Sequence, residues 1–376
     1  MTNEPIKAHI FTNIPQKHIF KQAIGCSTTI DNVTFSCGYD VPKNIDVLIV
    51  FTRASYSIQT RLPKERTVFT TGEPDVIHKY NSKYLNQFGL VRTSSTCSLS
   101  TEKIHGNMCS TPFVGLNFED ETKLLTLDWF RALECSNDKS DKISVVTSTK
   151  AHTPFHKSRM AFIDTIIEKI PEHLEIYGVG RKRVADKKDA ILPSKYHLSL
   201  ENGGGPFAWT EKLSDPLLCW SLPFYHGADN IECDLPADCI ARIDISKPEQ
   251  AIETMLKAIE NGLWAQRLDA IAEARQRIFT EHNLPTMFAN LAHRAMAKAP
   301  SIDPNGPKRL IRSERSFLPE EGGRGGFGQM LLRRCLTAID PQFELRAAPL
   351  QKKIEEHRSK RRARKHAAKE ASYKSI

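Results

Sequence analysis

A glycine-rich stretch in the middle of the chain combines groups that can bind phosphate. A β-rich run ends at Leu200, and the residues ENGGG (201–205) follow it directly. Thr210 then suits an N-cap, with Glu211 and Lys212 in the first turn of a helix. Glycines let backbone approach a ligand closely, and N–H groups at a helix start beside a lysine suit a diphosphate. The alternative is a glycine-rich connection with a solvent-facing Glu-Lys pair.

Arg159 is a second candidate for binding an anion. The run 143–147 reads as a strand and 157–170 as an amphipathic helix, which predicts Arg159 in the first helical turn, at the carboxyl edge of a sheet. A guanidinium there can hold two phosphate oxygens at once. The alternative is a surface arginine on an amphipathic helix. The glycine-rich stretch at 201–212 does not have the spacing of a Walker A loop or of GxGxxG.

Glu73 is a candidate for proton transfer. It lies in a short Gly-Glu-Pro turn directly after the β-rich run 67–71. Ligands of open α/β sheets bind just past the carboxyl ends of strands. A carboxylate at that place could accept a proton from a hydroxyl substrate across a cleft. A solvated turn residue is the alternative.

The elements that must position these residues alternate between strands and helices, which predicts an α/β fold with parallel sheets. Early β-rich runs at 7–11 and 45–51 are followed by a polar segment at 136–142 that suits a hinge. Three apolar-periodic helices are expected between 249 and 297. The predicted units are an N-terminal Rossmann-like domain at 1–140, a C-terminal Rossmann-like domain at 141–299, a Pro/Gly-rich linker at 300–328 and a basic tail at 329–376.

The composition is that of an ordinary folded protein. The chain has 376 residues, of which 40% are hydrophobic and 26% charged, which suits two domains. Its longest apolar run, 47–51, is far shorter than a spanning helix needs. The first residues lack the pattern of a signal peptide, so we expect a cytoplasmic protein. Nine scattered cysteines without a Cys-x-x-Cys pair favour reduced thiols over a disulfide or zinc framework.

The net charge of +9 is concentrated at the C-terminal end. Residues 351–376 hold ten Lys/Arg and three Glu, a net +7, which leaves +2 for the other 350 residues. A near-neutral body argues against a nucleic-acid-binding core. The tail suits a basic helix on an anionic membrane surface or a disordered basic arm. The run GGRGGFG at 322–328 adds a weaker indication of RNA binding.

The central stretch contains YHL at 196–198, EN at 201–202, TEK at 210–212 and PFYHG at 223–227. In this order they resemble the donor-binding pattern of the family 10 glycosyltransferases, the α-1,3/α-1,4-fucosyltransferases. That pattern has a Tyr-Lys/His-Phe/Leu strand, Glu-Asn, a short loop, Thr-Glu-Lys and a strand ending in Pro-x-Tyr-x-Gly. Residues 159–164 are similar to the family's helix with a phosphate-binding arginine, and 71–73 to the turn that holds its proposed base.

The resemblance implies a GT-B fold, in which two Rossmann-like domains face a cleft and the C-terminal one holds GDP-β-L-fucose. It implies inversion at the anomeric carbon without an obligatory metal or other cofactor. Glu73 would deprotonate the acceptor hydroxyl, and Arg159 and Lys212 would stabilise the departing GDP. The acceptor would be a cell-surface glycan or glycolipid of the O-antigen or capsule type, reached from the inner face of the membrane. The further donor contacts implied are Tyr177, Gly178, Glu201, Asn202, Trp209, Thr210 and Glu211.

Two positions depart from the family pattern. Gly203 stands where the family usually has serine, and Ala208 where it often has a tyrosine that contacts the nucleotide. A transferase that uses another sugar nucleotide is therefore an alternative, as is a non-enzymatic, basic-tailed protein that binds membrane or RNA. The run 119–121 (EDE) suits a solvated turn better than an Asp-x-Asp metal motif.

Overall fold

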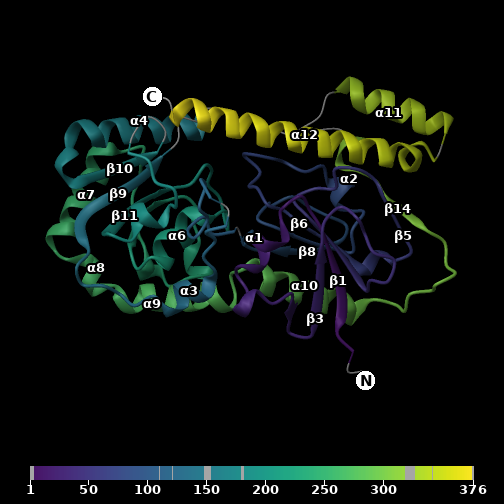
Figure 1. Ribbon diagram of the computed structural model, residues 1–376, viewed down its shortest axis with the longest axis horizontal. Coiled ribbons are helices and arrows are strands. Elements are labelled where there is room, and N and C mark those ends of the chain that lie inside the picture. Colours follow the sequence, from purple (N-terminus) through teal and green to yellow (C-terminus); the bar gives the residue numbers. More distant parts are fainter. Residues whose placement is uncertain are drawn as a thin grey trace.

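The computed structural model describes residues 4–109, 111–120, 122–147, 154–178, 182–317, 327–340 and 342–374. These residues form two α/β domains that lie side by side, with a long C-terminal helix along one side of the molecule (Figure 1). Residues 148–153, residues 179–181 and most of the glycine-rich run 322–328 lie outside the described residues.

The N-terminal domain is built on a mainly parallel sheet in the order β2-β3-β1-β4-β6-β7-β8, of which the β2–β3 pair is antiparallel. All five residues of the central strand β4 are buried, as expected of a strand covered on both faces. The bounds are β1 Ile6–Phe11, α1 Gln16–Phe20, β2 Thr29–Ile30, β3 Val33–Cys37, β4 Val47–Phe51, β5 Ile58–Thr60, β6 Thr67–Thr70, α2 Ser82–Leu85, β7 Leu90–Thr93 and β8 Glu102–His105.

The C-terminal domain has a parallel sheet in the order β10-β9-β11-β12-β13, with its own apolar core. Tyr196 stacks on Phe224 of the neighbouring strand at 5.3 Å between ring centroids. The bounds are α3 Leu127–Ala132, β9 Ser140–Thr147, α4 Pro154–Lys169, β10 Leu174–Gly178, α5 Lys188–Ile191, β11 Ser194–Leu200, α6 Glu211–Leu218, β12 Leu222–His226, β13 Ala241–Arg242, α7 Pro248–Glu260, α8 Leu263–Gln266 and α9 Leu268–Thr280.

The strand orders fix where ligands can bind. In each sheet the direction of strand addition reverses once, between β9 and β11 in the C-terminal domain and between β1 and β4 in the N-terminal one. Open α/β sheets bind ligands at the carboxyl ends of the strands beside such a reversal. One cavity is lined by the carboxyl ends of strands from both sheets. Two parallel α/β domains that face a common cleft are the GT-B arrangement, which confirms the predicted fold.

The chain passes between the domains at places that the predicted boundaries miss. Val114 and Phe130 pack in the C-terminal core, although the first domain was predicted to end at 140. Helix α10 (Leu284–Lys298), predicted within 141–299, returns to the N-terminal sheet, where Phe288 meets Phe51 at 5.3 Å between ring centroids. Helical periodicity identifies an amphipathic helix but does not indicate which sheet it covers.

The region after α10 is not a free linker. Strand β14 (Arg309–Ile311) pairs with β5, and Ile311 is fully buried. Within the predicted tail at 329–376, the described residues form α11 (Phe327–Ile339) and α12 (Phe343–Lys374), so of the two alternatives the helix is the right one. Near the start of α12, the buried carboxylate of Glu344 accepts hydrogen bonds from the hydroxyls of Ser57 and Ser316. No helix among the described residues is long and apolar enough to cross a membrane.

Candidate active site

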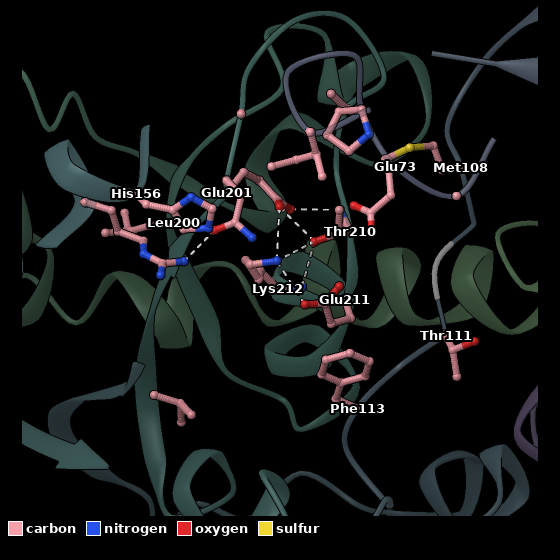
Figure 2. Close-up of a pocket in the computed structure, with 18 of the residues that line it drawn as sticks. Glu73, Met108, Thr111, Phe113, His156, Leu200, Glu201, Thr210, Glu211 and Lys212 are labelled. Carbon is pink, nitrogen blue, oxygen red and sulfur yellow. Dashed lines mark hydrogen bonds and ion pairs between the residues drawn. The ribbon is translucent and has the colours of Figure 1, made fainter. Parts of the chain in front are cut away.

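The cleft between the domains encloses about 570 Å³, the size of a small-molecule site. From the N-terminal domain it receives the turns after β4 and β6, and from the C-terminal domain the ends of β9 and β11, the glycine loop and the start of α6 (Figure 2). The predicted site residues that line it are Glu73, Arg159, Glu201, Asn202, Thr210, Glu211 and Lys212.

Thr210 fixes the start of α6. Its side chain caps the helix by accepting from the backbone N–H of Lys212, as predicted. Its own N–H and hydroxyl both donate to the carboxylate of Glu201, at 2.7 Å each. Glu201 follows β11 directly and is 4% exposed, and its burial raises the pKa of the carboxyl. Glu201 therefore ties the end of the strand to the first turn of the helix.

Lys212 lies between two carboxylates. Its Nζ is 2.9 Å from Glu211 Oε1 and 3.6 Å from Glu201 Oε2 (Figure 2). Burial on its own lowers the pKa of Lys212, but the two carboxylates outweigh burial and raise it. For Glu211, burial raises the pKa, and Lys212 and Lys187 more than reverse that effect. The start of α6 thus carries a permanent cation.

Arg159 is buried at 9% exposure and donates from Nη1 to Asn202 Oδ1 at 2.6 Å. Its Nε has no hydrogen-bond partner among the described residues. Helix α4 begins by Pro154, so Arg159 lies in the second turn and not, as predicted, in the first. A buried N–H donor without a partner costs free energy, and an anionic oxygen in the cleft would satisfy it.

Lys187 is a third cation of the cleft, which the sequence did not single out. Its Nζ lies 2.8 Å from Asp215 Oδ2, and Asp215 also accepts from the backbone N–H groups of Phe113 and Val114. Asp215 is fully buried, so the pair anchors the segment around Val114 beneath the cleft. The residues around Lys187 are rich in Lys and Asp (RKRVADKKDA, 181–190), but a contact between residues 28 positions apart has no local signal in the sequence.

Two histidines of the cleft were also not singled out. His156, on α4, lines it and is 7% exposed. His197, inside β11, is 2% exposed, and its Nδ1 lies 2.8 Å from the hydroxyl of Ser144 on β9. Burial, aided by the positive charge of Lys187, lowers the pKa of His197 to about 3, so this ring is neutral at physiological pH.

Glu73 faces these groups from the other domain. It follows β6, is exposed, and its carboxylate points across the cleft toward Thr210 (Figure 2). Gly72 before it leaves no room for a side chain, since a Cβ there would overlap the methyl group of Thr52. The turn therefore brings the Glu73 carboxylate to the cleft, opposite the cations.

Three predicted donor contacts are not among the residues that line the cleft. The indole of Trp209 is buried and donates to Asp234 Oδ2 at 2.8 Å, so its side chain belongs to the core. Tyr177 and Gly178 end β10 at the outer edge of the sheet, with Lys182 Nζ 5.1 Å from the centre of the Tyr177 ring. The sequence at 207–209 did not indicate which of these side chains lines the cleft; among Ala208 and Trp209 it is Ala208.

No protein-family model and no curated protein matches the chain. Among solved structures, an α1,3-fucosyltransferase with GDP-fucose aligns at 15% identity over 81% of this chain and 94% of its own, with a TM-score of 0.49. An α1,3-fucosyltransferase structure with GDP aligns at 16% identity over 81% of this chain and 93% of its own, with a TM-score of 0.49. A UDP-forming α,α-trehalose-phosphate synthase from Burkholderia xenovorans aligns at 7% identity over 68% of this chain and 75% of its own, with a TM-score of 0.40. These values are too low to transfer binding or activity to this chain.

Proposed function

We propose that this protein is an inverting glycosyltransferase that moves fucose from GDP-β-L-fucose to a hydroxyl of a cell-surface glycan. The observation that carries the proposal is the convergence of Arg159, Lys187 and Lys212 at the carboxyl edge of one sheet, opposite Glu73 on the other. The sequence pattern at 196–227 supports fucose as the sugar and GDP as the nucleotide.

In the proposed reaction the diphosphate lies against the cations, and the unpaired Nε of Arg159 donates to one of its oxygens. The acceptor oxygen attacks the anomeric carbon from the side opposite the diphosphate, and the bond from that carbon to the phosphate oxygen breaks. The acceptor proton passes to Glu73, and the bonding electrons leave with GDP. Negative charge grows on the diphosphate in the transition state, so cations fixed there lower the barrier.

Binding of nucleotides and turnover test the proposal together. Calorimetry is expected to show binding of GDP, and turnover with GDP-fucose should fall roughly 100-fold or more in Arg159→Ala and Lys212→Ala. Lys169→Ala, an exposed residue on the same helix as Arg159, is the control and should match the wild type. Glu73→Gln should keep its GDP affinity and lose transfer by about 10²–10⁴-fold. Failure of the wild type to bind any GDP compound would overturn the proposal.

A second candidate is a transferase that uses another sugar nucleotide. It is favoured by Gly203 and Ala208, two small residues that line or adjoin the cleft where the family pattern has larger ones. Binding of UDP-sugars in place of GDP-sugars would establish this candidate and remove fucose. Glycosyl transfer itself would then remain, because the cations and Glu73 serve either nucleotide.

We place the enzyme at the cytoplasmic face of a membrane, where it would build a glycan of the O-antigen or capsule type. The support is the excess of Lys and Arg in 351–376. Each cation close to anionic lipid contributes ~1 kcal/mol to the free energy of membrane binding. Flotation with vesicles of neutral or mixed anionic lipid at rising salt tests this placement. Equal flotation with both kinds of vesicle would rule it out.

A further inference from the structure

A second cavity adjoins the cleft on the N-terminal domain. It encloses about 390 Å³ and is lined by residues 12–16, residues 37–39 and Glu356. The first two groups directly follow or end β1 and β3, the kind of edge at which open parallel sheets bind ligands. Ile14 lines both cavities, so a ligand that fills one reaches the other at that side chain.

The loop after β3 is held from several sides. The buried ring of His9 lies 3.0 Å from the carbonyl of Gly38 and 2.8 Å from the hydroxyl of Ser36. The hydroxyl of Tyr56 donates to the carbonyl of Tyr39. An added Cβ at Gly38 would meet no atom within 4 Å, so the cavity is open in front of this loop. A fixed loop beside open space is preorganised for a ligand.

Helix α12 supplies the remaining wall. Lys352 forms an ion pair with Asp40 of the same loop, and Glu356 lies one helical turn further on, over the cavity. Figure 1 shows α12 running along the N-terminal domain on its way toward α4. The Lys352 contact therefore links the β3 loop to the part of α12 that carries Glu356, more than 300 positions further along the chain.

The lining chemistry suits a neutral sugar. It combines hydroxyl and amide groups of Thr12, Asn13 and Gln16 with the ring of Tyr39 and one carboxylate, and none of its residues is Lys or Arg. Burial raises the pKa of the Cys37 thiol to about 12, so this group is neutral too. Carboxylates and amides accept hydrogen bonds from sugar hydroxyls, whereas an anionic group would meet the Glu356 carboxylate with no Lys or Arg among the lining residues.

We propose that this cavity is an acceptor subsite for a neutral glycan, and that Glu356 of α12 is a specificity-determining residue in it. The proposal rests on the glycosyltransferase function, since it supplies the second substrate of that reaction. It gives the C-terminal helix a part in substrate selection in addition to any contact with lipid. A sugar that extends past Ile14 would present its neighbouring ring to the cleft that holds Glu73.

Glycan binding by the full chain, saturated with GDP, tests this subsite. The probes are immobilised neutral oligosaccharides and the same oligosaccharides capped with sialic acid. Neutral probes are expected to bind, and sialylated ones to bind more weakly. Glu356→Ala, which removes the carboxylate, and Asn13→Trp, which fills the cavity from an exposed position, should each weaken neutral binding roughly tenfold or more. Lys353→Ala, exposed on the same helix and outside the lining, is the control.

The affinity for GDP, measured on the same samples, separates this proposal from the one that it rests on. Loss of neutral glycan binding in Glu356→Ala and Asn13→Trp with unchanged GDP affinity would support the subsite. Neutral binding that survives in both variants, preference for sialylated probes, or no glycan binding by a wild type that binds GDP would overturn it. A wild type that fails to bind GDP would refute the donor site instead.

Discussion

Gly203 and Val76 determine how closely the glycine loop approaches the turn after β6. A Cβ built on Gly203 would overlap the side chain of Val76, which belongs to the opposite domain. The small residue at 203, a departure from the family pattern, is therefore explained by a contact across the cleft. A larger residue at 203 and a smaller one at 76 should compensate each other.

Gly203→Ser is accordingly expected to weaken GDP binding by pushing the two domains apart at the cleft. Adding Val76→Ala should restore most of the loss, with a coupling of about 1 kcal/mol in a double-mutant cycle measured by calorimetry. Gly204→Ser is the control, since a Cβ there meets a single atom, at 3.9 Å. Additive effects of the two substitutions would contradict the contact.

His197 should make the protein sensitive to acid. Its folded pKa is about 3 against an ordinary 6.5, because burial keeps the ring neutral. The stabilisation is complete above pH 6.5 and is lost as the pH falls toward 3, since the unfolded chain takes up the proton first. At pH 5 the loss is about 2 kcal/mol, and urea unfolding at pH 7 and pH 5 should show it.

The variant His197→Gln should lose less stability than the wild type over the same interval, because glutamine does not titrate. His173→Gln, at a half-buried position outside the cleft, is the control and should keep the wild-type dependence of stability on pH. An identical loss of unfolding free energy between pH 7 and pH 5 in His197→Gln and in the wild type would show that other groups cause the acid sensitivity.

Site residues that are recognised by their neighbours in the sequence could be predicted. Thr210 and Lys212 follow from a glycine run and a helix start, and each lines the cleft. Lys187 could not be found in this way because its partner Asp215 lies on another element. Trp209 was misplaced for the same reason, since its hydrogen bond to Asp234 crosses 25 positions.

At the scale of elements, α6 depends on the bond between Thr210 and Glu201. The threonine hydroxyl both caps the helix and donates to the buried carboxylate. Thr210→Val removes both interactions and should lower the free energy of unfolding by about 1–2 kcal/mol. It should also weaken GDP binding, because Lys212 loses its fixed position. Thr254→Val, in the exposed face of α7, is the control, and an equal loss of stability in both variants would argue against a special role for the cap.

The types of most elements followed from the sequence, but their partners did not. The strand β9, the helix α4 and the helix α10 are present close to their predicted ranges. The periodicity of α10 could not reveal that it covers the N-terminal sheet, because an apolar face fits either domain. Strand β14 has three residues and pairs with β5, some 250 positions away, which leaves no local pattern to recognise.

At the scale of the whole molecule, the C-terminal helix divides into a docked part and an extension. Its start is held by the buried Glu344, with Arg333 Nη1 at 3.6 Å, and its second quarter by the Lys352–Asp40 pair. The basic residues that account for most of the net charge lie mainly beyond Arg358. The prediction of one basic tail, which rested on charge, therefore combined two segments that have different roles in the fold.

Two truncations separate these parts. Removal of 359–376 should leave the melting temperature and the GDP affinity close to those of the full chain, because the docking contacts at 344 and 352 remain. Removal of 343–376 should lower the melting temperature by several degrees, since Ser57 and Ser316 lose the carboxylate that accepts their hydrogen bonds and Arg333 loses its counter-charge. Thermal unfolding, with calorimetry for GDP, measures both. Equal melting temperatures for the two truncated chains would show that the start of α12 does not hold the N-terminal domain together.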